Sequence, residues 1–236
     1  MIYIHGDTHR ELFRFCGAHM PGESTWTDQD YLIITGDFGF VFTGEDQDEE
    51  ERLMLDALAR RPYTILFVDG NHEGFPFLSA YPQQVRFGAP VRKIRDNIFW
   101  LQRGYIYTIE GNTFFVMGGA YSMDKAYRQK YFEVCGQRIW FEEELPTKEE
   151  YHRAIANLQQ ANMTVDYVLT HTAPRTIIPR IINAPPDPHD GELTGFLDWI
   201  YHEATFRKWY FGHFHVDEQI NDQMIACLNK IHILGE

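Results

Sequence analysis

Short apolar runs bounded by Gly, Asp or Asn divide the chain into predicted β-strands. In the first third, residues 2–4, 31–35 and 64–68 alternate with stretches of helical character, which favours parallel βαβ pairing. In the middle and at the end of the chain, several runs follow one another without a helix between them, which indicates hairpins. These later predicted strands are residues 98–102, 106–109, 113–117, 167–170, 209–211 and a pair near 223–229 and 230–234. The pattern therefore favours an α/β sandwich of two sheets over a single doubly wound sheet.

Charge placement and capping residues predict two helices. The acidic run 45–51 leads into residues 52–61, which end in two arginines, so the charges complement a helix dipole. Thr147 and Glu150 have the spacing of a capping box, which predicts a helix that continues to about residue 161. The apolar positions of both segments are best explained as core packing.

Amphipathic spacing predicts two further helices. Residues 10–19 place Leu12, Phe13 and Cys16 on one side, and Thr194 is expected to cap a short helix that runs to His202. Residues 182–190 contain two adjacent prolines and predict a surface loop at the border of a cleft.

Composition narrows the class of protein. The 236 residues are 44% hydrophobic and 23% charged, without repeats or linkers, so we expect one globular domain over residues 1–236. Lys plus Arg number 21 against 34 Asp plus Glu, and the net charge of −13 excludes binding of bulk nucleic acid by positive field. The negative net charge does not exclude an anionic substrate, provided that side chains near the site supply positive charge.

The chain shows no signal for membranes or disulfides. It has neither an apolar run of about 20 residues nor a signal-peptide pattern, so we expect no membrane association and a cytoplasmic location. Three scattered cysteines argue against a disulfide framework or a cysteine-based zinc site.

Polar residues that can bind metals stand just after the ends of five predicted strands. In an open α/β sheet, ligands bind in the crevice outside the carboxyl ends of the strands, so these residues are expected to converge. Glycines before three of them allow the sharp turns that this placement needs. The candidates are Asp7 and His9, Asp37, Asn71 with His72 and Glu73, His171, and His213 with His215.

The residue types point to hard or borderline cations. Imidazole, carboxylate and amide ligands suit Mn, Fe, Zn or Co according to supply. Seven such ligands exceed the needs of one tetrahedral ion and fit two ions that share a bridging carboxylate, as in displacement reactions at phosphorus. Each motif alone is common, because an Asp-x-His or Gly-Asp turn has ordinary structural uses. The five together, in order, are difficult to explain by packing.

This ordered set resembles the calcineurin-like metallophosphoesterase superfamily, and it is similar to small bacterial and phage-type members. The motifs are Asp7-x-His9, Gly36-Asp37, Gly70-Asn71-His72-Glu73, His171 and Gly212-His213-x-His215. The resemblance implies a four-layer αββα sandwich of two mixed β-sheets flanked by helices, with two divalent metal ions, Mn being favoured. It implies that Asp7, His9 and His215 hold one ion, that Asn71, His171 and His213 hold the other, and that Asp37 bridges them.

The implied activity is hydrolysis of phosphomonoester or phosphodiester bonds by in-line attack of a metal-bridging hydroxide. His72 would be catalytic, as a general acid or a transition-state stabiliser. Many members continue the second motif to a further Asp that orients this histidine, but Phe40 stands there. The partner of His72 is therefore open, and membership of the Ser/Thr protein phosphatase branch is an alternative that this departure disfavours.

A Gly-Gly-Ala-Tyr-Ser segment after the predicted strand 113–117 suggests substrate contacts. Tyr121, Lys125, Arg128 and Arg138 could stack on or pair with a small phosphate ester, a nucleotide among the choices, although an exposed loop explains the segment equally well. We favour a diesterase or nucleotide-directed enzyme over a monoesterase. Two other classes are a binding module with a decayed site and a structural metal site. Retention of every ligand argues against the first, and the absence of a closed cysteine site argues against the second.

Overall fold

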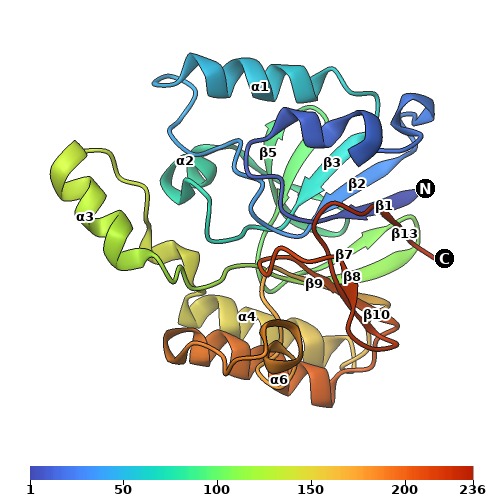
Figure 1. Ribbon diagram of the computed structural model, residues 1–236. Helices are drawn as coiled ribbons and strands as arrows, with labels where there is room; N and C mark the ends of the chain where they lie inside the picture. The colour runs from blue at the N-terminus through green and yellow to red at the C-terminus, as the bar shows by residue number, and fades with distance from the viewer. Residues whose placement is uncertain (236) are drawn as a thin grey trace.

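Two mixed β-sheets form the centre of the computed structural model, which describes residues 1–235 (Figure 1). In the first, β1, β2, β3 and β6 are parallel, and antiparallel strands flank them on both sides. Its seven strands lie in the order β13 (His232–Ile233), β1 (Ile2–His5), β2 (Tyr31–Ile34), β3 (Thr64–Phe67), β6 (Ile98–Leu101), β5 (Ala89–Arg95) and β4 (Gln83–Arg86).

The second sheet repeats this plan with six strands. β12, β10, β9 and β8 are parallel, and β11 and β7 are antiparallel edges. The order is β11 (Glu218–Gln219), β12 (Met224–Ala226), β10 (Lys208–Phe211), β9 (Tyr167–Thr170), β8 (Asn112–Met117) and β7 (Ile106–Ile109). The carboxyl ends of both parallel sets are therefore available to build one site.

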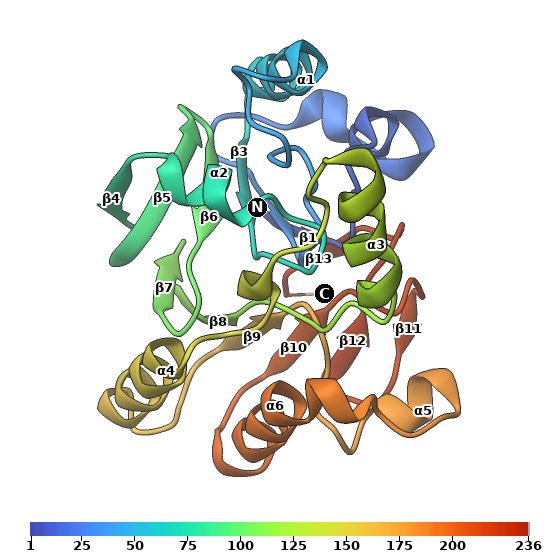
Figure 2. The same ribbon diagram turned by 90° about the vertical axis from the view of Figure 1, so that its left-hand side faces the viewer.

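Helices cover the outer face of each sheet, as Figures 1 and 2 show. One buried cluster, with Leu66 and Leu169 among its members, fills the space between the sheets, and two more lie between each sheet and its helices. The first sheet is covered by α1 (Glu49–Ala59), α2 (Phe75–Ala80) and the 3₁₀ turns of residues 12–25, and the second by α4 (Lys148–Gln160), α5 (Ile178–Ile182) and α6 (Gly191–Glu203). The predicted four-layer αββα sandwich is confirmed.

The predicted strands are present, but the last two do not form a hairpin, because β12 lies in the second sheet and β13 in the first. Neither β11 nor the β4–β5 hairpin was predicted. The outer strand of this hairpin reads Gln83, Gln84, Val85 and Arg86, and only Gln84 is even half-buried. An edge strand of this kind is held by backbone hydrogen bonds to β5 and buries little surface, so its sequence needs no apolar run.

Local capping signals were the most accurate predictors of helices. α4 begins with the predicted capping box, in which the Thr147 side chain accepts from Glu150 N–H and the Glu150 carboxylate accepts from Thr147 N–H. α1 begins inside the acidic run, where the side chain of Asp48 accepts from Glu51 N–H, and it ends at Ala59, just before the arginines.

Two helix predictions require correction. Residues 10–19 do not form a helix but two 3₁₀ turns, Leu12–Phe15 and Gly17–His19, because Cys16 is extended and Gly17 has a φ of 60°. Thr194 does not cap α6, because the helix already begins at Gly191 and the Thr194 hydroxyl donates to Asp190 O. The expected loop 182–190 contains the end of α5 and the 3₁₀ turn Pro188–Asp190.

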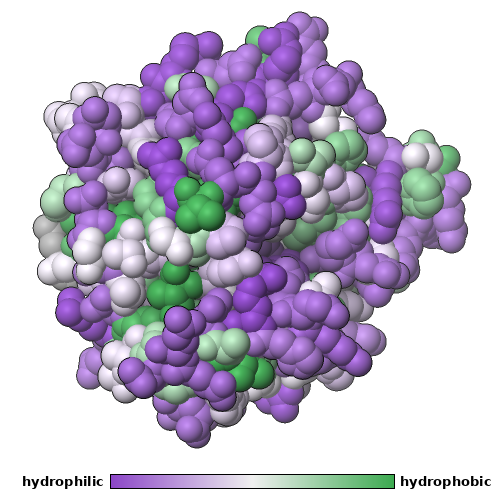
Figure 3. Space-filling view, turned by 180° about the vertical axis from the view of Figure 1, so that it is seen from behind, coloured by the Kyte–Doolittle hydropathy of each residue, from purple (hydrophilic) through white to green (hydrophobic). Residues whose placement is uncertain are grey.

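Helix α3 (Lys125–Cys135) projects from the body of the molecule, where the sequence left a substrate-contacting segment and an exposed loop as alternatives (Figure 1). Arg128 is its buried residue, whereas Tyr127, Phe132 and Val134 are exposed. The projecting arm carries green, hydrophobic atoms at its tip in Figure 3. Arg128 is thus the side chain of this helix that lies deepest in the body of the molecule.

The three cysteines are free thiols, as expected from their spacing. Within residues 1–235, none of the helices combines the length and the apolar character that crossing a membrane requires.

Candidate metal centre

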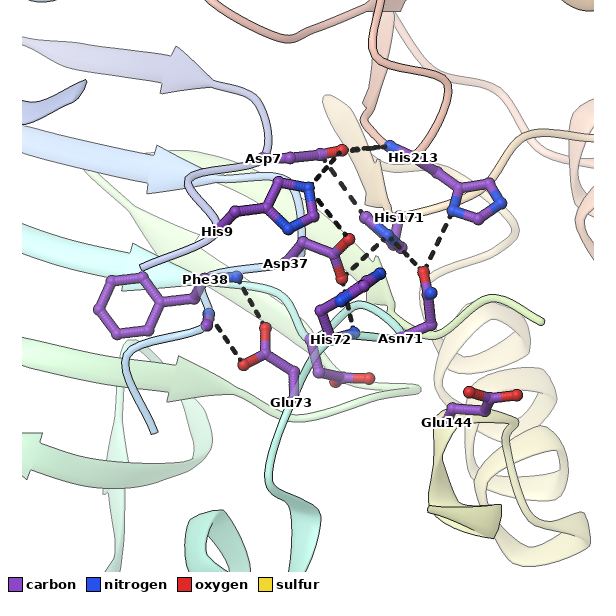
Figure 4. A network of polar contacts seen from close by, with 12 residues as sticks. Asp7, His9, Asp37, Phe38, Asn71, His72, Glu73, Glu144, His171 and His213 are labelled. Atoms are coloured by element: carbon purple, nitrogen blue, oxygen red, sulfur yellow. Dashed lines mark hydrogen bonds and ion pairs between the residues drawn. The ribbon is translucent and has the colours of Figure 1, made fainter. Parts of the chain in front are cut away.

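Seven side chains that can bind metals meet at the carboxyl ends of the parallel strands, and Figure 4 labels all of them except His215. Asp7 and His9 follow β1, Asp37 follows β2, and Asn71 follows β3. The second sheet supplies the others, His171 after β9 and His213 with His215 after β10. Because both sheets present these strand ends at the same edge, the structure brings all seven predicted residues together.

The first group of ligand atoms comes from Asp7, His9, Asp37 and His215. One ligand atom from each lies within 4.8 Å of all the others. Asp7 Oδ2 is 3.3 Å from His215 Nε2, and Asp37 Oδ2 is 3.6 Å from His9 Nε2. The two imidazole Nε2 atoms are 3.0 Å apart. Two carboxylates and two imidazoles therefore face one point.

The second group surrounds the amide oxygen of Asn71. Asn71 Oδ1 is 3.2 Å from His171 Nε2 and 3.2 Å from His213 Nδ1. His171 Nε2 is also 3.3 Å from Asp37 Oδ1. Asp37 thus directs Oδ2 to the first group and Oδ1 to the second, which is the position of a bridging carboxylate.

These spacings fit divalent cations. Metal bonds of about 2.1 Å to nitrogen and oxygen place neighbouring ligand atoms about 3.0 to 3.4 Å apart in octahedral or tetrahedral geometry. Most of the distances within both groups lie at or near this range. Nitrogen and oxygen ligands without sulfur suit Mn, Fe, Zn or Co. The residues present therefore fit two ions, one for each group.

Strained backbone holds several of these side chains in place. His9, Asp37, His213 and His215 have φ values of 45°, 47°, 69° and 52°. Left-handed backbone is uncommon for residues other than glycine, and it persists where the surrounding structure supports it, often at functional sites. Four of the seven candidate ligands share this feature, which the sequence motifs did not reveal.

All three glycines that precede candidate ligands are required by close approach, and a Cβ atom on Gly70 would collide with the Asp37 carboxylate. A Cβ atom on Gly212 would collide with the Asp7 carboxylate, and one on Gly36 would collide with the ring of His171. Gly36 also has a φ of 105°. These glycines give the candidate ligands room as well as allowing the chain to turn.

Asp37 and His171 hold each other in their charged forms although both are buried. Burial alone would raise the pKa of Asp37, but the neighbouring imidazole of His171 lowers it well below its usual range. Burial likewise opposes the charged form of His171, and the Asp37 carboxylate outweighs this effect and raises the pKa of His171. Burial lowers the pKa of His213 to about 3. The centre therefore holds an anionic Asp37 that favours positive charge beside it.

His72 lies beside this centre, and its backbone N–H donates to Asp37 Oδ1 over 2.8 Å. Its imidazole contacts the Arg128 guanidinium, with Nη2 2.6 Å from Nε2. Burial lowers the pKa of His72 to about 4, an effect that Asp37 opposes and Arg128 increases. The sequence left the partner of His72 open, and in the structure Arg128 contacts its ring.

Neither Phe40 nor Glu73 orients His72. Phe40 is fully buried and packs edge-on against Phe15. The Glu73 carboxylate points away from the imidazole and accepts from the N–H groups of Phe38, at 2.7 Å, and Gly39, at 3.1 Å. Neither residue therefore replaces the carboxylate that orients this histidine in many members of the superfamily.

A pocket of about 180 Å³ opens beside the candidate ligands. Of the four predicted substrate contacts, Tyr121 and Arg128 line it. Lys125 instead places Nζ 4.2 Å from the centre of the Trp140 ring, and Arg138 donates through Nε to Trp140 O. These two residues lie outside the lining of this pocket.

Sequence reasoning also missed two residues next to Asn71. Asn71 Nδ2 donates to Ser122 Oγ over 3.0 Å, and Ser122 Oγ donates to Glu144 Oε2 over 2.6 Å. Ser122 could have been found from the sequence, because it ends the Gly-Gly-Ala-Tyr-Ser segment that follows β8.

Comparison with known families supports the family resemblance that the motifs indicate. The model of the calcineurin-like phosphoesterase family matches residues 2–217. Among solved structures, the chain is similar to a Staphylococcus aureus protein provisionally assigned as a 5′-nucleotidase, in complex with alpha-ketoglutarate. The identity is 14% and the TM-score is 0.48, over 95% of this chain and 48% of the other, so this chain spans about half of that protein's length. Comparison with curated proteins found no match. With the family model matching most of its length and the family's site motifs together in space, the chain belongs to the calcineurin-like phosphoesterase family.

Proposed function

We propose that this protein is a binuclear metal-dependent phosphoesterase. The observation that carries the proposal is the position of Asp37, whose two carboxylate oxygens face two separate groups of ligand atoms. Asp7, His9 and His215 would complete one ion site, and Asn71, His171 and His213 would complete the other. Membership of a phosphoesterase family supports the same reaction class.

Two bound divalent ions supply a nucleophile from water at neutral pH and neutralise charge on the phosphoryl group. The chain has to hold the ester beside them and assist departure of the leaving oxygen. His72 and Arg128 border the pocket together with the candidate ligands Asp37, Asn71 and His213. A phosphate ester in this pocket would therefore contact both side chains.

His72 would protonate the leaving oxygen or donate a hydrogen bond to it. Burial lowers the pKa of His72, and the Arg128 guanidinium beside the ring lowers it further. The negative charge of a phosphate ester raises the pKa of a neighbouring imidazole, and its oxygens compete for the guanidinium. Substrate binding therefore favours the protonated form of His72.

Arg128 would pair with the non-bridging oxygens of the phosphoryl group. Arg128 is buried, its Nη2 contacts the His72 ring, and both residues line the pocket. A planar guanidinium binds phosphate through two parallel hydrogen bonds, which suits this task better than a lysine would. Tyr121, whose ring stacks on His189, would border the leaving group.

A small phosphate ester is the proposed substrate, and we favour a diester or a nucleotide. The phenylalanine at position 40, where the protein phosphatase branch has a carboxylate, argues against that branch. We also propose Mn²⁺ as the working ion, one domain over residues 1–236, and a cytoplasmic location, which the three free thiols support.

The test is phosphate release from nucleotides, sugar phosphates and phosphopeptides with added Mn(II), together with hydrolysis of bis-p-nitrophenyl phosphate and p-nitrophenyl phosphate. Metal analysis of protein purified without chelator is expected to give two equivalents per chain. Turnover of the diester above the monoester is expected. A strong monoester preference would overturn the diesterase choice, and no hydrolysis of any ester by protein that holds two ions would overturn the enzyme assignment.

A further inference from the structure

A chain of buried hydrogen bonds runs from Asn71 to a carboxylate that lies outside both ligand groups. Asn71 Nδ2 donates to Ser122 Oγ at 3.0 Å, and Ser122 Oγ donates to Glu144 Oε2 at 2.6 Å. The backbone N–H of Ser122 donates to Glu144 Oε1 at 3.1 Å. Ser122 and Glu144 are each 1% exposed, so water has little access to compete for these bonds.

The observed bonds run in one direction, with Ser122 Oγ donating to Glu144 Oε2, and the chemistry of these groups allows only this direction when Glu144 is ionised. An ionised Glu144 carboxylate can only accept, so the Ser122 hydroxyl gives it its single proton. The Ser122 oxygen then has only lone pairs left for Asn71, and only the NH₂ end of the amide can use them. The Asn71 oxygen must therefore point the other way, toward His171 and His213, where it lies 3.2 Å from each.

Glu144 is itself held in place from the opposite side. It ends the 3₁₀ turn Glu142–Glu144, whose carbonyls at Glu143 and Glu144 accept from Arg103 Nη2 at 2.8 and 3.2 Å. Arg103 also pairs with the buried carboxylate of Asp69, two residues before Asn71. Figure 4 shows Glu144 on the side of Asn71 away from His171 and His213.

We propose that Ser122 and Glu144 are positioning residues that hold the Asn71 amide with Oδ1 toward the second metal ion. With the amide reversed, its NH₂ group would face that ion, and an amide nitrogen that carries two protons offers no lone pair to a cation. The inference rests on the proposed two-metal function but concerns metal binding and not turnover. Partners of this kind typically change metal affinity by about 10-fold to 100-fold when they are removed.

The experiment measures Mn(II) binding to the full chain by calorimetry and by the spin-coupled signal of a Mn(II) pair in electron paramagnetic resonance. The Ser122→Ala variant is expected to weaken binding of the second ion by about 10-fold or more and to leave the first within about twofold. Ser79→Ala, at an exposed position on α2, is the matched control and is expected to bind like the parent chain. Unchanged binding of the second ion by Ser122→Ala would overturn the proposal.

A double-mutant cycle separates orientation from general damage to the fold. In Asn71→Asp, the carboxylate presents an oxygen to the metal whichever way it turns, so the orienting hydroxyl becomes unnecessary. Adding Ser122→Ala to this variant is therefore expected to change affinity for the second ion by less than about twofold. An equal loss in both backgrounds would show that Ser122 supports only the fold, which would overturn the proposal.

Failure of the enzyme assignment would look different. A parent chain that binds two Mn(II) ions without hydrolysing any ester would refute the proposed reaction. The metal-binding cycle would still report on Ser122 and Asn71 in that case, because its measurement does not depend on turnover.

Discussion

The guanidinium of Arg128 lies against the imidazole of His72, with Nη2 2.6 Å from Nε2 and 3.1 Å from Nδ1. Arg128 also pairs with Asp124, with Nε 2.8 Å from Oδ1, and donates to Ile139 O. Two groups that can both carry positive charge are thus held together at the edge of the pocket. Such a pair is suited to an anion, because a phosphoryl group can accept hydrogen bonds from both.

Replacing Arg128 is expected to weaken catalysis without removing metal. Arg128→Ala should lower kcat/KM by about 100-fold, and Arg128→Lys should restore little, because an ammonium group lacks the planar pair of donors. Lys125→Ala and Arg138→Ala remove cations outside the pocket lining and should stay within about twofold. Steady-state kinetics and metal analysis check this. Equal losses in all three alanine variants would contradict a specific role for Arg128.

Replacing His72 is expected to slow turnover while leaving both ions bound. His72→Ala should lower kcat by about two to four decades, because a positioned acid contributes about this much to departure of a leaving group. The loss should be larger for an alkyl ester than for p-nitrophenyl phosphate, whose leaving group needs less protonation. Full activity of the variant on both esters would show that His72 is not the acid.

Ligand substitutions are expected to remove metal and activity together. Asp37→Asn removes the negative charge between the two ligand groups, and His213→Ala removes one ligand of the second. Both should bind fewer than two ions per chain by elemental analysis, and Mn(II) should raise their Tm less than that of the parent. His152→Ala, at an exposed position on α4, is the control. Two tightly bound ions in Asp37→Asn would contradict the bridging assignment.

Asp190 is expected to make stability depend on pH. Burial raises the pKa of this carboxyl to about 7 in the folded protein. Between about pH 4 and pH 7 the folded state then keeps a proton that the unfolded chain has lost, so the free energy of unfolding falls as pH rises. Asp190→Asn, which cannot ionise, should flatten this fall when Tm is measured from pH 5 to pH 8. The exposed Asp28→Asn should not, and parallel curves for Asp190→Asn and the parent would refute the assignment.

Glu73 is expected to stabilise the loop that carries Asp37. Its carboxylate accepts from the N–H groups of Phe38 and Gly39, and it is completely buried. Glu73→Ala leaves both donors without this partner, at a cost of about 1 to 3 kcal/mol for each unpaired group. Urea denaturation should show this loss, whereas the exposed Glu133→Ala on α3 should change stability by less than about 0.5 kcal/mol. A loss in Glu73→Ala as small as that of the control would contradict the role.

The candidate ligands could be identified from sequence because their signal is local. Asp37 and Asn71 each stand at a glycine turn directly after a buried aliphatic strand, and parallel strands end at the same edge of a sheet. The capping box at Thr147 was readable for the same reason, since its two partners are three residues apart. Predictions failed where local signal was weak. The edge strand β4 has no apolar run, and the amphipathic segment 10–19 is broken at Cys16.

Contacts between distant segments were decided by the tertiary structure. Arg128 reaches His72 across 56 positions, and Ser122 reaches Asn71 across 51, through a helix and a loop whose approach to the site leaves no periodic pattern. The left-handed backbone at His9 and His213 also depends on neighbours that only folding supplies. The sequence by itself determined which residues could bind metal and which strand ends carry them, because short-range chemistry encodes both. The distances within the two groups, and the residues that orient them, depended on packing between the two sheets.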